Sequence, residues 1–246
     1  GSFIKVASEW SSKTYQNTRS SLSTGPLEPN VKWRYKTGDG VTSSPSVSGG
    51  LVFVGSKDDY IYALDQYTGE LKWKYKTGAG VYSSPSVSGG LIFVGSFDNY
   101  IYALDQYTGE LKWRYKTGDT VTSSPSVSGG LVFVGSFDNY IYALDQYTGK
   151  LKWRYNTGGG VWSSPSVSDG LVFVQPDYSV VNENYIYALD QYTGTLKWRY
   201  KTEFVPEPQR SSPSVSGGLV FVGSFDNYIY ALDQYTGELK WRYKTG

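Results

Sequence analysis

The side chains that could do chemistry in this sequence are carboxylates, because the chain contains no histidine, cysteine or methionine. This composition excludes thiol nucleophiles, imidazole bases, disulfides and Cys/His metal sites. Asp39, Asp119, Glu183 and Glu207 stand where otherwise similar segments differ, and they could pair as general acid and base. Their spacing does not place any two at a catalytic separation. We therefore expect no catalytic residue, no metal and no cofactor, and we keep a carboxylate enzyme as a lower alternative.

Charge and hydropathy limit the partners. The 246 residues carry a net charge of +1, which gives no electrostatic reason to expect nucleic acid or an anionic membrane. No apolar run approaches the ~20 residues that a membrane-spanning helix needs. The sequence therefore predicts a protein without a nucleic-acid partner and without a membrane span.

An internal repeat organises the chain. The block SSPSVS occurs five times, and a strand-like segment KWRY or KWKY occurs six times. The tryptophans of that segment are Trp33, Trp73, Trp113, Trp153, Trp198 and Trp241. A repeat of about 40 residues that is rich in Val, Ile, Tyr and Trp is typical of stacked β units rather than helices.

Each unit predicts four strands, separated by short turns that contain Gly, Asp or Asn. In the second strand, Leu51 and Phe53 share one face and Val52 and Val54 the other, so both faces are expected to be buried. Such a sheet cannot bury its own faces, and it must stack on its neighbours in a ring. We predict an all-β fold, a β-propeller of five four-stranded antiparallel blades. Six or more blades, or a strand-swapped oligomer, are the alternatives.

The chain is predicted to consist of an N-terminal lead-in, residues 1–30, and a propeller, residues 31–246. The additional tryptophan strand at residues 31–37 is expected to close the ring by pairing with the outer edge of the last blade. Residues 239–246 offer nearly the same strand for that edge. Two segments therefore compete for one position, which leaves a homo-oligomer formed by strand exchange open.

The segment YALDQYTGELKW, Tyr102–Trp113, resembles the PQQ-like β-propeller repeat, with its pattern A-x-D-x-x-T-G-x-x-x-W and its tryptophan-docking motif. The matching residues are Ala103, Asp105, Thr108, Gly109 and Trp113. The family includes quinoprotein dehydrogenases and non-catalytic scaffolds, such as a lipoprotein that assists outer-membrane protein assembly. The resemblance implies an extracytoplasmic location, which could be periplasmic, secreted or at the cell surface. The smaller number of blades, their uniformity and the missing vicinal cysteines speak against quinone binding.

The residues of this motif also have a direct physical interpretation. Asp105 can accept hydrogen bonds from backbone N–H groups two or three residues later, which closes an Asx-type turn. Gly109 suits a backbone position with positive φ. Trp113 offers a large flat apolar surface for the contact between blades. Residues repeated in every unit are therefore expected to serve the core and the turns.

The positions at which the units differ are expected to lie on one face of the ring, which we call the top face. The residues just before each SSP are Thr42, Tyr82, Thr122, Trp162 and Arg210. Residues 175–185 contain an insertion, and residues 202–213 a longer link, and we expect the two to be neighbours. The candidate ligand-binding residues are Tyr82, Trp162, Tyr178, Asn182, Glu183, Phe204 and Arg210.

The sequence thus predicts a non-catalytic binding or scaffold propeller that recognises a protein or glycan partner through its top-face loops. One alternative is a recently amplified or engineered repeat with no evolved small ligand, because the units are almost uniform. A quinoprotein-like enzyme is a lower alternative. Neutral drift of the longer loops would account for their variation without any ligand.

Overall fold

The computed structural model describes residues 3–5, 31–177, 183–203, 205 and 211–245. These residues form 22 β-strands, and none of their segments is a helix that could cross a membrane. A two-stranded sheet contains β1 (Phe3–Lys5) and β2 (Arg34–Lys36). Blade 1 comprises β3 (Ser46–Ser48), β4 (Leu51–Gly55), β5 (Tyr60–Asp65) and β6 (Leu71–Lys76). Blade 2 comprises β7 (Ser86–Ser88), β8 (Leu91–Gly95), β9 (Tyr100–Asp105) and β10 (Leu111–Lys116).

Three further blades repeat the pattern. Blade 3 comprises β11 (Ser126–Ser128), β12 (Leu131–Gly135), β13 (Tyr140–Asp145) and β14 (Leu151–Asn156). Blade 4 comprises β15 (Ser166–Ser168), β16 (Leu171–Val174), β17 (Asn184–Asp190) and β18 (Leu196–Thr202). Blade 5 comprises β19 (Ser214–Ser216), β20 (Leu219–Ser224), β21 (Tyr228–Asp233) and β22 (Leu239–Lys244). The prediction of five four-stranded antiparallel blades is confirmed.

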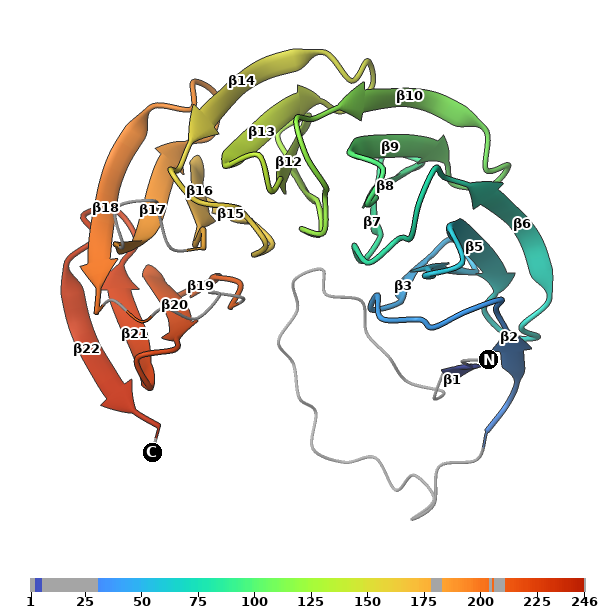
Figure 1. The fold of residues 1–246 in the computed structure, drawn as a ribbon, viewed down its shortest axis with the longest axis horizontal. Coiled ribbons are helices and arrows are strands. Elements are labelled where there is room, and N and C mark those ends of the chain that lie inside the picture. The colour runs from blue at the N-terminus through green and yellow to red at the C-terminus, as the bar shows by residue number, and fades with distance from the viewer. Residues whose placement is uncertain (1–2, 6–30, 178–182, 204, 206–210, 246) are drawn as a thin grey trace.

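The blades stand side by side around a centre, with the first strand of each blade inside and the fourth strand outside (Figure 1). They form an open arc, because blade 5 and the β1–β2 sheet lie apart at its two ends (Figure 1). The expectation that residues 31–37 pair with the last blade is wrong. β22 already occupies the outer edge of β21, and β2 pairs instead with β1, whose residues belong to the predicted lead-in.

The burial of each strand follows from its place in the blade. Every residue of β12 is buried, since this strand has a neighbouring blade on both faces. In β10, Trp113 is buried and Tyr115 half-buried, whereas Lys112 and Arg114 on the opposite face are exposed. The core consists of layers between blades. In one of them, Phe93 and Trp113 of blade 2 cluster with Val132 and other residues of blade 3.

One tryptophan joins each blade to the next. The Trp113 indole Nε1–H donates to the backbone oxygen of Gln146, at 2.9 Å, and the ring lies over the Gly149 turn of blade 3. A Cβ atom on Gly149 would lie 2.6 Å from Trp113 Cδ2, so only glycine leaves room for the ring. The φ angle of Gly149 is also positive, at 68°. A single residue thus permits both the turn and the contact between blades.

An aspartate precedes that glycine and closes the same turn. Asp145 Oδ1 accepts hydrogen bonds from Tyr147 N at 3.1 Å and Thr148 N at 3.0 Å. Lys152 Nζ lies 3.1 Å from Asp145 Oδ2. The backbone N–H of Thr148, followed by the Lys152 ammonium, lowers the pKa of the Asp145 carboxyl to about 2. The turn is therefore formed around the ionised carboxylate.

We predict that Gly149→Ala destabilises the protein more than Gly130→Ala does. Both glycines have a positive φ, but a Cβ at Gly130 meets nothing within 4 Å. Gly130→Ala should cost only the backbone strain of about 1–2 kcal/mol. Gly149→Ala must also displace the Trp113 ring, and we expect ~3 kcal/mol or more. Denaturant unfolding of the two variants measures the difference, and equal losses would contradict the double role of Gly149.

We also predict that acid weakens the fold through these turns. A carboxyl whose pKa is lower in the folded state stabilises it fully above its unfolded pKa, near 4, and loses that contribution as the pH falls through about 2. Asp145→Asn should reduce this acid-dependent loss of stability by less than about 1 kcal/mol, because the carboxylate is partly exposed and its interactions are screened by solvent. Thermal unfolding between pH 5 and pH 2 tests this. Parallel curves for the variant and the parent protein would refute it.

Candidate functional site

The top face is built from two kinds of segment, the link that enters each blade and the loop between its second and third strands. Backbone hydrogen bonds join the two. Phe97 N donates to Gly80 O at 3.1 Å, and Phe137 N donates to Thr120 O at 3.0 Å. Val121 N also reaches back to Ser96 O of the preceding blade, at 3.1 Å. The side chains on these segments are therefore held at the inner ends of the blades.

A buried tyrosine and an aspartate anchor each regular loop. Asp98 Oδ2 accepts hydrogen bonds from Gly78 N and from the Tyr102 hydroxyl, both at 2.6 Å. Asp98 Oδ1 accepts from Tyr100 N at 3.0 Å. Burial, and then the hydrogen bond to Asp98, raise the pKa of Tyr102 well above its usual value. Tyr102 thus stays protonated and keeps donating, which holds the loop in one conformation.

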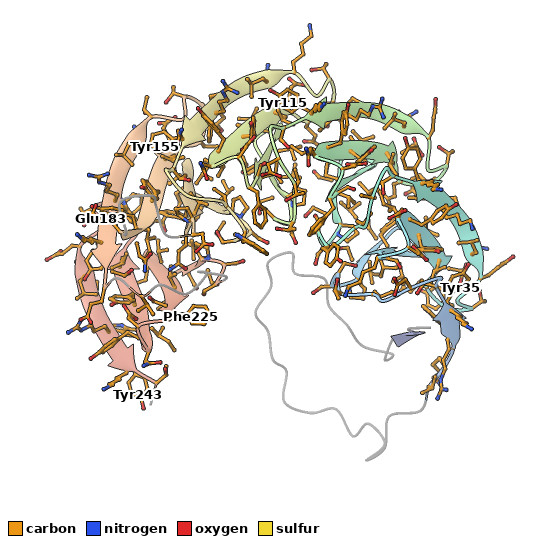
Figure 2. The ribbon with its side chains drawn as sticks, in the orientation of Figure 1. Tyr35, Tyr115, Tyr155, Glu183, Phe225 and Tyr243 are labelled. Atoms are coloured by element: carbon orange, nitrogen blue, oxygen red, sulfur yellow. The ribbon has the colours of Figure 1, made fainter. Side chains whose placement is uncertain are left out.

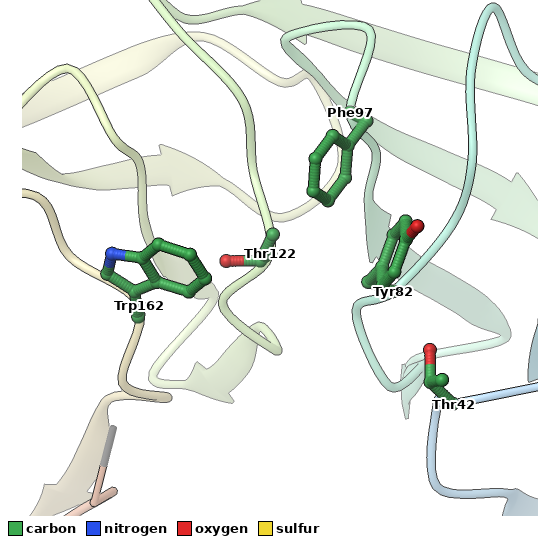
Figure 3. Close-up of a pocket in the computed structure, with 5 residues that line it drawn as sticks. All are labelled: Thr42, Tyr82, Phe97, Thr122 and Trp162. Atoms are coloured by element: carbon green, nitrogen blue, oxygen red, sulfur yellow. The ribbon is translucent and has the colours of Figure 1, made fainter. Parts of the chain in front are cut away.

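These segments line an open cavity of about 330 Å³ at the inner ends of the blades. We call it the mouth cavity, and it is lined by Thr42, Tyr82, Phe97, Thr122 and Trp162. Tyr82 and Phe97 form one wall, with ring centroids 4.4 Å apart, and Trp162 forms the opposite wall (Figure 3). Phe137 supports Trp162 edge-on, with centroids 3.9 Å apart.

Thr122 lies between the two aromatic walls, and its hydroxyl points towards Trp162 (Figure 3). The Thr122 Oγ1 atom is buried and has no hydrogen-bond partner among the described residues. A buried hydroxyl without a partner typically costs about 1–3 kcal/mol. A ligand group that donates to this oxygen, or accepts from its hydroxyl, would remove that cost once the Thr122 side chain turns it towards the cavity. The mouth cavity thus offers apolar ring faces together with the hydroxyl groups of Thr42, Tyr82 and Thr122.

The sequence candidates are placed as follows. Tyr82 and Trp162 line the same cavity. Tyr178, Asn182, Phe204 and Arg210 lie outside the described residues, as does the expected meeting of the two longer loops. Thr42 and Thr122 were recognised only as variable positions. Phe97 is not among the predicted residues, because a phenylalanine recurs at the same place in other units, at Phe137 and Phe225.

Glu183 serves a local ion pair. Its carboxylate lies 2.6 Å from Lys201 Nζ and accepts from the Tyr185 hydroxyl at 2.7 Å. These contacts, that of Lys201 first, lower the pKa of Glu183. Figure 2 places Glu183 beside β18, at the outer part of the arc. Glu183 is therefore not one of the side chains that line the mouth cavity.

The carboxylates considered as acid and base have local partners too. Asp39 Oδ1 accepts from Gly40 N at 2.6 Å, and Asp119 Oδ1 accepts from Thr120 N at 2.7 Å. Each one thus caps its own link. Glu207 lies outside the described residues. Within the described part of the chain, no group of three or more acidic residues has an arrangement that could hold a metal ion.

Comparison with solved structures shows the propeller fold. BamB from Moraxella catarrhalis has a TM-score of 0.57 at 20% identity, covering 88% of this chain and 78% of its own. A europium-containing methanol dehydrogenase has a TM-score of 0.74 at 20% identity, covering 86% of this chain and 52% of its own, so the chain spans about half of that enzyme. The computationally designed Ika8 protein has a TM-score of 0.68 at 20% identity, covering 82% of this chain and 61% of its own.

Sequence comparison gives the family. No curated protein matches the chain. The family described as "Outer membrane protein assembly factor BamB" matches residues 19–126 and 117–246, and together these ranges cover most of the sequence. This match confirms the predicted resemblance to PQQ-like repeats. The chain therefore belongs to the BamB-like family of PQQ-like repeat propellers.

Proposed function

We propose that the protein is a non-catalytic binding module that recognises a protein or glycan partner through the mouth cavity of its top face. The observation that carries the proposal is the pair of facing aromatic walls around the unpartnered Thr122 hydroxyl. Rings of this kind bind through their apolar faces, and the hydroxyl fixes the orientation of the ligand. None of the five described residues that line the cavity is a carboxylate, which supports a binding role over acid–base chemistry.

Two observations bear on the class of partner. All five residues lining the cavity are uncharged, and a sugar ring offers the matching combination of an apolar face and hydroxyl groups. The description of the family names a protein assembly factor, which favours a protein partner. That description also supports an extracytoplasmic location as part of the proposal.

An amplified or engineered repeat without a ligand is the second candidate, and the similarity to a designed propeller favours it. The distribution of differences speaks for a site. Thr42, Tyr82, Thr122 and Trp162 occupy the same position in four successive units, while the SSP that follows is unchanged. Variation among residues that line one cavity is expected of a binding surface.

We predict that the double substitution Tyr82→Ala/Trp162→Ala weakens binding by at least about 30-fold, the loss expected when buried aromatic anchors are removed. A glycan array and a pull-down identify the class of ligand with the unchanged protein. The control is Tyr67→Ala, because Tyr67 is 78% exposed in the third-to-fourth turn of blade 1. Binding that survives the double substitution, or that fails equally in the control, would remove the mouth cavity from consideration.

We further predict that Thr122→Val distinguishes the contribution of the side chain's volume to binding from that of its hydroxyl group. Valine keeps the volume and removes the unpartnered oxygen, so the stability of the free protein should stay the same or rise by up to ~1 kcal/mol. Affinity should fall by about tenfold, because the bound ligand loses one hydrogen bond. Calorimetry on the variant measures both quantities. Unchanged affinity would show that the hydroxyl does not contact the ligand.

A further inference from the structure

The open end of blade 5 displays a face that every other blade buries. Trp241 is 45% exposed, whereas its counterparts are only 8–9% exposed. Ile229 is 38% exposed, whereas the equivalent isoleucines of blades 1 to 4 are fully buried. Tyr243 lies at the same end of the arc, near the C-terminus (Figure 2). We call this surface the open face, and it consists of Ile229, Trp241 and Tyr243.

The four junctions between blades show what fits this face. At each of them, a tryptophan donates to the backbone oxygen of a glutamine in the next blade, as Trp198 does to Gln234 at 3.0 Å. The inner strands add two bonds. Ser164 N donates to Ser212 Oγ at 2.9 Å, and Ser166 Oγ donates to Pro213 O at 2.7 Å. The complement of the open face is therefore the front of another blade of the same repeat.

A blade of this kind, with free acceptors, is present at the other end of the chain. Ser44 Oγ and Pro45 O of blade 1 receive no such donors from the described residues. On blade 5, the matching donors Ser212 N and Ser214 Oγ have no acceptor within the described part of the chain. The inner halves of the two end blades are thus complementary in hydrogen bonding.

The outer half of the blade 1 front is covered by β2. Trp33 Nε1 donates to Gln66 O at 3.0 Å, and its ring lies over Gly69. Residues 32–38 and 240–246 have the identical sequence KWRYKTG. The segment that now covers blade 1 and β22 therefore carry the same side chains, so β22 can offer blade 1 the same tryptophan contact. β2 belongs to a two-stranded sheet, whereas β22 brings a complete blade with it.

We propose that the open face of one copy of this chain binds the front of blade 1 in a second copy, where β22 takes the place of β2. Trp241 then donates to the Gln66 oxygen of the second copy and packs on its Gly69. Compared with β2, the incoming blade adds the inner-strand hydrogen bonds and buries Ile229 as well. The contact is heterologous, since it joins two different surfaces, so each associated pair keeps one surface of each kind unused until a ring closes.

The experiment measures the mass in solution by light scattering over a concentration series. The full chain should associate. Trp241→Ala should raise the dissociation constant by at least about 30-fold, as removal of a buried interface tryptophan does. Glu110→Ala, on the exposed third-to-fourth turn of blade 2 and away from both surfaces, is the matched control and should associate like the parent protein. A single-chain mass at every concentration overturns the proposal, because the arc then stays open or closes on itself.

Two further variants identify the surfaces. Gly69→Arg blocks the blade 1 front and should not associate alone, whereas an equimolar mixture with Trp241→Ala should give 1:1 pairs. Self-association of Gly69→Arg, or a mixture that stays dissociated, contradicts the pairing of blade 5 with blade 1. Trp33→Ala should strengthen association, because β2 then leaves more readily. Association that is unchanged or weaker refutes the exchange with β2. Circular dichroism verifies that each variant is folded.

Discussion

The contact between a tryptophan ring and a glycine turn sets the rules for the whole molecule. Gly149 must adopt a positive φ to end its Asx turn, and it must lack a Cβ to accept Trp113. The same turn supplies the Gln146 oxygen that the indole N–H needs. Local backbone geometry and the packing between blades therefore depend on the same few residues. This dependence explains why the DQYTG sequence is identical in every unit.

The blades were predictable because the sequence features that determine them act within a single repeat unit. Alternating apolar residues, the Asp–Gly turns and the repeat period all act over distances shorter than one unit. The pairing of β2 was not predictable, since KWRYKTG at residues 32–38 and 240–246 is the same sequence in two surroundings. At the N-terminal end it pairs with β1, and at the C-terminal end it completes blade 5. Identical segments can be told apart only by their tertiary partners.

The candidate site was partly predictable for a related reason. Comparison of the units identified Tyr82 and Trp162, because each differs from its counterparts at one position. The same comparison hid Phe97, whose side chain recurs in other blades but faces a cavity only where its neighbours make one. It also drew attention to Glu183, which is unusual in sequence yet is engaged with Lys201. Sequence variation marks a change in surroundings. Only the structure shows whether the variable residue lines a cavity or makes a local ion pair within the protein.

Blade 4 shows how the top face can change while the junctions stay constant. In blades 1 to 3, the aspartate two residues before the first tyrosine of the third strand binds the entering link, at Asp58, Asp98 and Asp138. The longer loop of blade 4 has Glu183 at this place in the sequence. Asn156, where the other units have lysine, supplies Oδ1 to Gly158 N at 2.8 Å. The Tyr187 hydroxyl, without its usual carboxylate, donates to Thr157 O at 3.0 Å. Asp177 N still donates to Gly160 O at 2.7 Å, which matches the bond that holds Phe97 in blade 2. The link that carries Trp162 is therefore held by the same backbone bond as in the regular blades, so a loop beside the mouth cavity can vary while the wall of the cavity stays in place.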